Sequence, residues 1–371
     1  MTTRLNAIRS ALADREAVAL VHAGPRTNPN VRYLLAGSDD VSAVEPAAVD
    51  TGPLTGREHD HVAVAVCADD VLVAAHGEGD HPASRLADRL ATRSPADGPT
   101  PDDTRVLAPA SIPHDAALYV ERAGFDLAST DVIDRARGRK DAPERRRIEA
   151  AQRAAGAGLR RGGVVLAEAT RGDDGLRYDG AVLSHDRLRR AIDAGIVEAG
   201  GEPTGATRVI GTGDADAAIR PGEPLVVRLA PSSPEGYRGY LARTLVPGTD
   251  GGWERRAHVA AESALRSAKT MLAAETATVR AVERELVAEA GSFGFERAAT
   301  GTVAGVGLTV GERPVRGGHE LGVGRVVALD VGVASPDGGA VVLGDLLAVR
   351  DDRVEWLERP PRTLEPSSLV P

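Results

Sequence analysis

The chain contains very little cysteine, lysine or aromatic side chain. Cysteine occurs once in 371 residues, at Cys67, so no disulfide bond can form within the chain. Cys67 lies in an alternating apolar segment, and we expect it to be a small buried hydrophobic residue. Lysine occurs only at Lys140 and Lys269, and aromatic residues make up 3% of the sequence. We interpret this bias as a mark of a GC-rich genome or a high-salt cytoplasm, which concerns habitat and not activity.

Long apolar runs and an excess of positive charge are also missing. No apolar run approaches the roughly 20 residues that cross a bilayer, and residues 1–16 are amphipathic and charged, unlike a secretory signal. We therefore expect a cytoplasmic protein without a membrane partner. The net charge of −9 argues against binding to nucleic acid. A hydrophobic content of 42% and the chain length are typical of a globular protein with two domains.

Apolar periodicity predicts the elements of the N-terminal half. Leu5, Ile8 and Leu12 recur at helical spacing, and an apolar strand follows at residues 17–21. Residues 61–67 and 71–75 predict a hairpin that turns at residues 68–70. A helix at residues 84–93, a loop at 94–103 and a strand at 105–108 are predicted next.

Residues 225–246, LVVRLAPSSPEGYRGYLARTLV, predict two strands joined by a Pro/Ser/Gly turn. This hairpin resembles the first metal-binding hairpin of the creatinase/prolidase/methionine-aminopeptidase family, the pita-bread hydrolases. Gly236-Tyr237 and Arg243-Thr244 match the family's Gly-Tyr and Arg-Thr pairs. Arg228 and Tyr240 stand where the family has its two aspartate ligands. No Asp or Glu lies in residues 225–234 or 238–243, so a shifted alignment would not supply either ligand.

Three later segments continue the resemblance. Residues 303–314, VAGVGLTVGERP, resemble the family's Gly-His-Gly-Ile-Gly-Leu segment, with Ala304 at the metal-binding His and Gly311 at the substrate-facing His. Residues 321–333 match the strand that supplies the first glutamate ligand, and Asp330 stands at that position. Residues 341–349 match the strand with Arg-x-Glu-Asp, and Gly344 replaces the bridging glutamate. Of five expected ligands, only Asp330 could still coordinate.

The resemblance implies two divalent ions such as Mn, Co or Zn, but the residues present do not favour them. A pair of such ions needs several converging anionic or imidazole donors and bridging carboxylates. We therefore predict no metal and no catalytic residue at this site. Arg228 is expected to occupy the place of a cation and to pair with Asp330.

Other candidate acid/base groups are weaker. The metal-free creatine-hydrolysing branch uses a histidine that would fall in residues 210–221, where this chain has none. Glu312 and His319 could form a substitute acid/base pair, although their Gly-rich surroundings favour a loop over the cleft. Asp214 and Asp216 could form a displaced metal site, but the same residues suit a surface turn with Asx hydrogen bonding.

The N-terminal hairpin offers one separate metal hypothesis. If the turn lies at residues 68–70, His61 and His76 face one another across the strands, with His59 and His81 one step outside. Cross-strand Cβ atoms are about 4.5–5.5 Å apart, close enough for two imidazoles to share a zinc or nickel ion. The alternative is a solvated polar end of the hairpin.

The predicted architecture is α+β. An α/β N-terminal domain of the creatinase type, residues 1–140, is followed by a pita-bread domain, residues 141–371. The boundary rests on the segment RGRKDAPERRRIEAAQRAA, where Pro143 and Glu144 suit the first turn of a helix. In the second domain, residues 188–196 and 279–286 show helical spacing, the latter ending near Gly291.

Three functions remain open at this point. The first is a non-catalytic relative of the Xaa-Pro peptidases, a homodimer whose old cleft binds a peptide, a small anion or a protein partner. The second is an active Xaa-Pro dipeptidase or aminopeptidase with a non-standard site. The third is a regulatory partner of an active paralogue.

Overall fold

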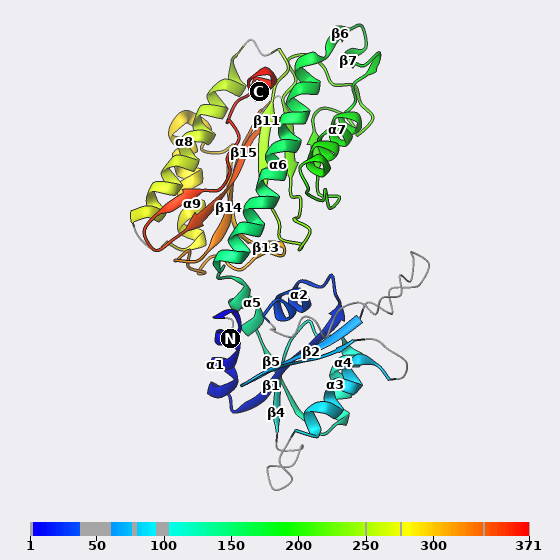
Figure 1. Cartoon of the computed structure of the whole chain (residues 1–371). Helices are drawn as coiled ribbons and strands as arrows, with labels where there is room; N and C mark the ends of the chain where they lie inside the picture. The colour runs from blue at the N-terminus through cyan, green and yellow to red at the C-terminus, as the bar shows by residue number, and fades with distance from the viewer. Residues whose placement is uncertain are drawn as a thin grey trace. The chain divides into compact units, whose positions relative to one another are not determined.

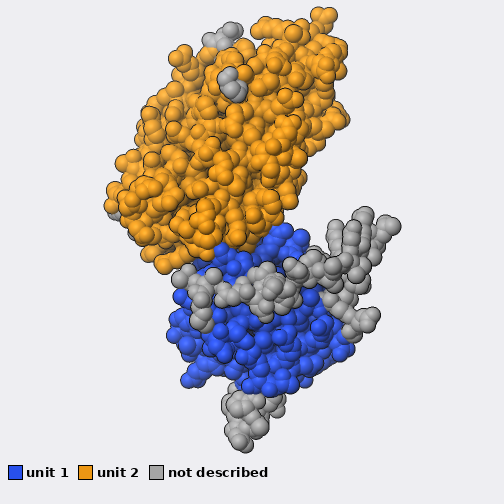
Figure 2. Space-filling model, viewed as in Figure 1, with its two compact units in different colours: residues 1–137 blue, residues 138–371 orange. Residues whose placement is uncertain are grey.

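The computed structural model describes residues 3–37, 61–75, 80–93, 104–248, 251–274, 277–336 and 338–370. The chain folds into two compact units, Met1–Arg137 and Gly138–Pro371, coloured separately in Figure 2. Each unit has its own sheet and its own hydrophobic core.

Unit 1 is built on a five-stranded mixed sheet in the order β3-β2-β1-β4-β5. Strand β1 is antiparallel to β2 and parallel to β4, and β4 is parallel to β5. Its elements are α1 (Asn6–Asp14), β1 (Ala17–Pro25), α2 (Pro29–Leu35), β2 (His61–Cys67), β3 (Val71–Ala75), α3 (Pro82–Ala91), β4 (Arg105–Pro109), α4 (His114–Arg122), β5 (Asp126–Thr130) and α5 (Val132–Arg137) (Figure 1).

The predicted elements of unit 1 are confirmed where the structure describes them. Strands β2 and β3 form the expected antiparallel hairpin, and Cys67 is a buried free thiol. Helix α3 begins two residues before the predicted start, because Pro82 suits the first turn and His81 caps it. The predicted loop at residues 94–103 lies outside the described residues.

Unit 2 contains an eight-stranded sheet in the order β13-β12-β14-β15-β11-β10-β9, with β16 also paired to β15, and a separate three-stranded sheet β6-β7-β8. Its helices are α6 (Ala142–Glu168), α7 (His185–Glu198), α8 (Trp253–Ala274) and α9 (Val279–Ala290). Its strands are β6 (Thr170–Gly172), β7 (Gly175–Tyr178), β8 (Ala181–Val182), β9 (Arg208–Ile210), β10 (Leu225–Leu229), β11 (Leu241–Leu245), β12 (Ala299–Val306), β13 (Val310–Glu312), β14 (Val326–Ala334), β15 (Ala340–Val349) and β16 (Val354–Trp356).

Two helix pairs cover one face of the large sheet. Helices α8 and α9 pack on β12, β14 and β15, whereas α6 and α7 pack on β10 and β11. Successive side chains on a strand point to opposite faces. The helix-covered face therefore carries Leu229, Leu241, Leu329 and Leu343, and the neighbouring residues in sequence point to the opposite face.

The start of α6 follows from its sequence. Asp141 accepts a hydrogen bond from the Glu144 backbone N–H at 2.7 Å, and Glu144 accepts one from the Asp141 N–H at 3.0 Å. This capping box, with Pro143 in the first turn, confirms the predicted helix start. Further along α6, a Cβ atom on Gly158 would lie 2.7 Å from Ile196 of α7, so glycine permits the close packing of the two helices. Within the described ranges, no helix is both long enough and apolar enough to span a membrane.

Candidate functional site

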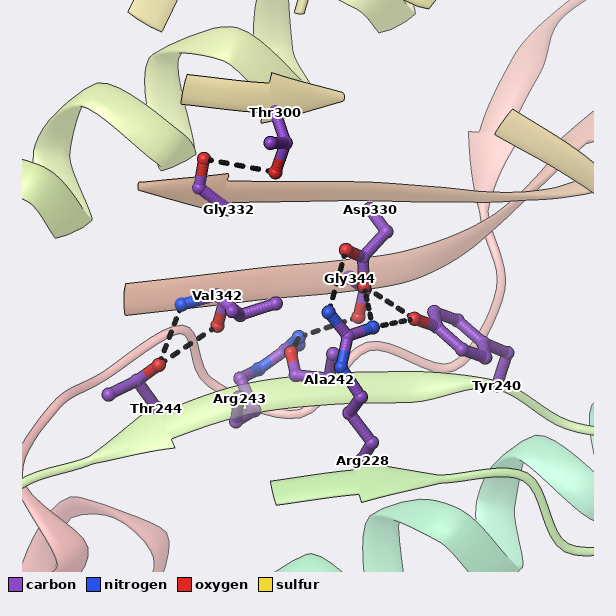
Figure 3. A network of polar contacts seen from close by, with 10 residues as sticks. All are labelled: Arg228, Tyr240, Ala242, Arg243, Thr244, Thr300, Asp330, Gly332, Val342 and Gly344. Carbon is purple, nitrogen blue, oxygen red and sulfur yellow. Dashed lines mark hydrogen bonds and ion pairs between the residues drawn. The ribbon is translucent and has the colours of Figure 1, made fainter. Parts of the chain in front are cut away.

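One row of residues crosses four strands on the face opposite the helices. The register places Arg228 of β10 beside Ala242 of β11, Ala242 beside Gly344 of β15, and Gly344 beside Asp330 of β14. Three strand spacings separate the Arg228 and Asp330 backbones by roughly 14 Å. Figure 3 shows the Arg228 side chain crossing this span and ending beside the Asp330 carboxylate. The two residues between them are small, so the long side chain can lie over them.

Arg228, Tyr240 and Asp330 form a connected polar network, which we call the arginine triad. Arg228 Nη1 donates to Asp330 Oδ2 at 2.6 Å and Nη2 donates to Oδ1 at 3.1 Å, a bidentate ion pair. Arg228 Nη1 also donates to the Tyr240 hydroxyl at 2.7 Å, and that hydroxyl donates to Asp330 Oδ2. The predicted pairing of Arg228 with Asp330 is therefore confirmed.

The surroundings of Tyr240 and Arg228 favour the protonated form of each side chain. Burial and the nearby Asp330 carboxylate raise the pKa of Tyr240, so its phenol keeps its proton and serves as a donor. Burial disfavours the charged form of Arg228, but Tyr240 and Asp330 outweigh it and raise the pKa of the guanidinium. The Arg228 side chain is 36% exposed and that of Asp330 11% exposed, so the carboxylate is the more deeply enclosed partner.

Gly344 leaves the space that the triad occupies. A Cβ atom there would lie 2.8 Å from Tyr240 Cε1, 2.9 Å from Asp330 Oδ2 and 3.0 Å from the Ala242 methyl group. A longer side chain at position 344 would therefore collide with the phenol ring and the carboxylate. The residues of the triad fill the volume that a glutamate at this position would need.

Ala304 and Gly311 complete the positions singled out from the sequence. Ala304 lies on β12 opposite Ala328 of β14, one strand beyond Asp330. Gly311 lies on β13 with φ of 88°, and no described atom lies within 4 Å of an added Cβ. Neither side chain offers a hydrogen-bonding or metal-binding atom. Sequence reasoning identified Arg228, Gly344 and Asp330 in the row but missed Ala242. Because Ala242 precedes Arg243 on one strand, the two side chains point to opposite faces, and this alternation could have placed Ala242 in the row.

On the helix-covered face, the same strands carry a second ion pair. Arg243 and Asp345 are fully buried, with Arg243 Nη2 2.7 Å from Asp345 Oδ1. Arg243 also donates to the Gly344 carbonyl at 2.9 Å and the Pro360 carbonyl at 3.1 Å. Next to it, the Thr244 hydroxyl accepts from the Val342 N–H at 2.7 Å. Arg243, Thr244 and Asp345 thus connect β11 to β15, and Arg243 also connects β11 to the C-terminal segment.

The sequence matches the model of metallopeptidase family M24 over residues 146–351. The chain belongs to metallopeptidase family M24. No curated protein matches the sequence significantly.

Solved structures share the fold over nearly the whole chain. The prolidase from Pyrococcus horikoshii OT3 is similar with a TM-score of 0.73 and 16% identity, over 98% of this chain and 100% of that one. The Xaa-Pro dipeptidase from Bacillus anthracis gives 0.74 and 14%, over 97% and 98%. Dipeptidase PepE from Mycobacterium ulcerans gives 0.66 and 19%, over 97% and 96%. At these identities the likeness establishes the two-domain pita-bread fold.

Glu312, one of the two residues of the hypothetical acid/base pair, does not lie where the sequence predicted. Sequence reasoning favours a loop over the cleft for Glu312, but this residue ends β13, is buried, and forms an ion pair with the buried Lys140. An added Cβ on Gly307 would lie within 3 Å of both charged groups, so the pair occupies the space beside that glycine. His319 Nδ1 accepts from the Val315 N–H at 3.1 Å. No pattern in the sequence indicates that Lys140 and Glu312, far apart along the chain, meet.

The remaining histidine and aspartate candidates belong to other segments of the chain than the triad. Asp214 Oδ1 accepts from the Asp216 N–H at 3.1 Å, which confirms the Asx turn. His76 and His59 lie outside the described residues, so the hairpin metal hypothesis stays a prediction. His81 caps α3 through Nδ1 and places Nε2 3.4 Å from Asp115 Oδ2, while His61 and His81 line one cavity of about 420 Å³.

The donor atoms of the site do not fit a pair of divalent ions. Of the six positions singled out, only Asp330 carries a carboxylate, and both its oxygens accept from Arg228. Across the residues that the structure describes, no group of three or more His, Cys, Asp or Glu side chains could hold a metal ion. A dication placed beside Asp330 would also face the Arg228 guanidinium, a cation in direct contact with the same carboxylate.

Proposed function

We propose that this M24 protein does not hydrolyse peptides and instead binds a peptide or a protein segment on the face that carries the arginine triad. The observation that carries the proposal is the bidentate Arg228–Asp330 pair, which spans the row where metal ligands would converge. The guanidinium supplies a fixed positive charge at this place, but it cannot activate water as a bound metal ion does.

The charge balance of the triad favours a peptide or protein ligand over a small anion. Asp330 neutralises Arg228 through two hydrogen bonds, so a small anion would have to compete with an existing carboxylate. The exposed part of Arg228 still attracts a negative group. A peptide would add backbone hydrogen bonds and apolar contacts to this attraction. Its terminal or side-chain carboxylate would share the guanidinium with Asp330.

The first test measures metal content and turnover together. Purified protein is offered Mn²⁺, Co²⁺ and Zn²⁺, its bound metal is determined by elemental analysis, and hydrolysis of Xaa-Pro dipeptides is followed. We expect no stoichiometric metal and no turnover from folded protein. Two metal ions per chain with metal-dependent turnover would overturn the proposal and favour the alternative, an active Xaa-Pro peptidase.

Binding is tested on the same dipeptides by calorimetry. We expect saturable binding without cleavage, weakened about tenfold or more in Arg228→Gln because the cationic end of the site is lost. Arg256→Gln is the matched control, since Arg256 is an exposed arginine on α8, which packs on the other face of the sheet. If Arg228→Gln and Arg256→Gln bound the dipeptides with equal affinity, Arg228 would not be part of the binding site.

A regulatory role beside an active paralogue remains the third hypothesis. It predicts mixed dimers, which pull-downs with differently tagged chains would detect. Recovery of this chain with itself alone would favour an independent binding protein.

A further inference from the structure

A second polar site lies on the helix-covered face, away from the arginine triad. Helix α8 and the segment at residues 362–365 line a pocket of about 450 Å³. Arg255 and His258 line it from the helix, and Arg362 lines it from the C-terminal segment. Arg362 is held in place, because its Nε donates to Asp345 Oδ2 at 2.8 Å.

Arg362 is a buried cation with unused hydrogen-bond donors. Its side chain is 3% exposed, and its guanidinium carbon lies 4.7 Å from the centre of the Trp356 ring. Neither Nη1 nor Nη2 has a hydrogen-bond partner among the described residues. Burying such donors without a partner is costly, so a polar group that reaches them would be stabilising.

The charges around Arg362 do not cancel. Asp345 accepts from Arg362 and also from Arg243, so two buried guanidinium groups share one carboxylate. The other bonds of Arg243 go to backbone carbonyls, which carry no net charge. The group of three therefore holds one excess positive charge, and an anion in the pocket would balance it.

His258 supplies a further donor to the same pocket. Its side chain is buried, and its Nε2 has no partner within the part of the chain that the structure describes. Burial lowers its pKa, and Glu262 opposes this shift while Arg243 and Arg362 add to it. An anion held beside His258 would act against these arginines and favour the protonated, doubly donating imidazole. Arg255, which also lines the pocket, adds attraction for an anion, and Glu365, another lining residue, reduces it.

We propose that this pocket binds a small oxyanion, the phosphate or carboxylate group of a metabolite, between the Nη atoms of Arg362 and the Nε2 atom of His258. The planar guanidinium presents two donors to such a group, and the Trp356 ring limits movement of the arginine. This site is separate from the triad and does not depend on whether the protein hydrolyses peptides.

Calorimetry with inorganic phosphate and with acetate, at constant ionic strength, tests the proposal and distinguishes the two kinds of oxyanion. We expect saturable binding of one of them to the wild type. His258→Leu should weaken it about tenfold or more, and Arg255→Gln should weaken it several-fold. Arg256→Gln, the same change one residue along α8, should leave the affinity unchanged because Arg256 does not line the pocket.

Arg362→Gln removes the central donor but also breaks a bond to buried Asp345, so it is interpreted only if circular dichroism shows a folded protein. The His258 and Arg255 variants keep that bond and test the site independently. Absence of saturable binding of both anions to folded wild type would overturn the proposal. Equal affinity in wild type, His258→Leu and Arg255→Gln would do the same.

Discussion

Gly344 determines whether the arginine triad can form. Replacement by alanine would place a methyl group 2.8 Å from the Tyr240 ring and 2.9 Å from the Asp330 carboxylate. We expect Gly344→Ala to lower the free energy of unfolding by about 1–3 kcal/mol, because β14, β15 and β11 are paired on both sides and cannot easily move apart. Urea denaturation measures the change.

Gly318→Ala is the matched control for this prediction. An added Cβ at Gly318 has no described atom within 4 Å, so the same chemical change should alter stability by less than about 0.5 kcal/mol. If the two variants were equally stable, the packing of Tyr240 and Asp330 around Gly344 would not be as tight as the structure indicates.

Cys67 provides a residue-scale test of unit 1. Burial, with nearby Asp70, raises the pKa of its thiol to about 11. The native protein should therefore react slowly with a thiol-specific disulfide reagent at pH 8 and rapidly once urea exposes the thiol. The folded state holds this proton more tightly than the unfolded chain, whose thiol pKa is about 8.5. The contribution to stability is thus complete below that pH and declines as pH rises toward 11. Fast native labelling would contradict the burial of Cys67.

At the scale of elements, the Lys140–Glu312 pair joins the residues just before α6 to the end of β13. Both side chains are buried, at 1% and 5% exposure. We expect Glu312→Gln to lower the free energy of unfolding by about 3–5 kcal/mol, because it removes the negative charge that faces the buried Lys140 ammonium group. A double variant, Lys140→Met with Glu312→Leu, should recover part of this loss since apolar residues can replace a buried pair.

An exposed ion pair serves as the comparison for this prediction. Arg353 and Glu355 are 54% and 26% exposed, and Arg353→Gln should cost less than about 1 kcal/mol because water screens the pair. Chemical denaturation of the wild type, Glu312→Gln, the double variant and Arg353→Gln measures the free energy of unfolding of each and ranks the losses. A small loss in Glu312→Gln would mean that water reaches Lys140 in solution.

At the scale of the whole molecule, we propose that the chain forms a homodimer. Sedimentation should then give twice the chain mass of 38.5 kDa at micromolar concentration. Each chain carries a net charge of −9, so two copies repel, and added salt should strengthen the association by screening. A single species of 38.5 kDa at every salt concentration would argue against the dimer.

Local patterns are reliable where one element determines them. The hairpin of β2 and β3, the start of α6 and the helical spacing in α7 follow from neighbouring residues, and these predictions are confirmed. The family resemblance aligned the motif residues with positions of this sequence, and this alignment led to the predicted pairing of Arg228 with Asp330. Glu312 was misplaced because its partner, Lys140, is 172 residues away, and no local pattern encodes such a contact.

Residue identity and spacing were enough to predict the lineage and the order of the elements, and they show that neither a carboxylate nor an imidazole stands at Arg228, Tyr240, Ala304, Gly311 and Gly344. The folded chain was needed to see that Arg228 reaches Asp330 over Ala242 and Gly344. It also places Arg362 and His258 at one pocket, each with a polar atom that has no partner among the described residues. Those features depend on strand order and helix packing, because a folded sheet brings together side chains that are more than 100 residues apart along the chain.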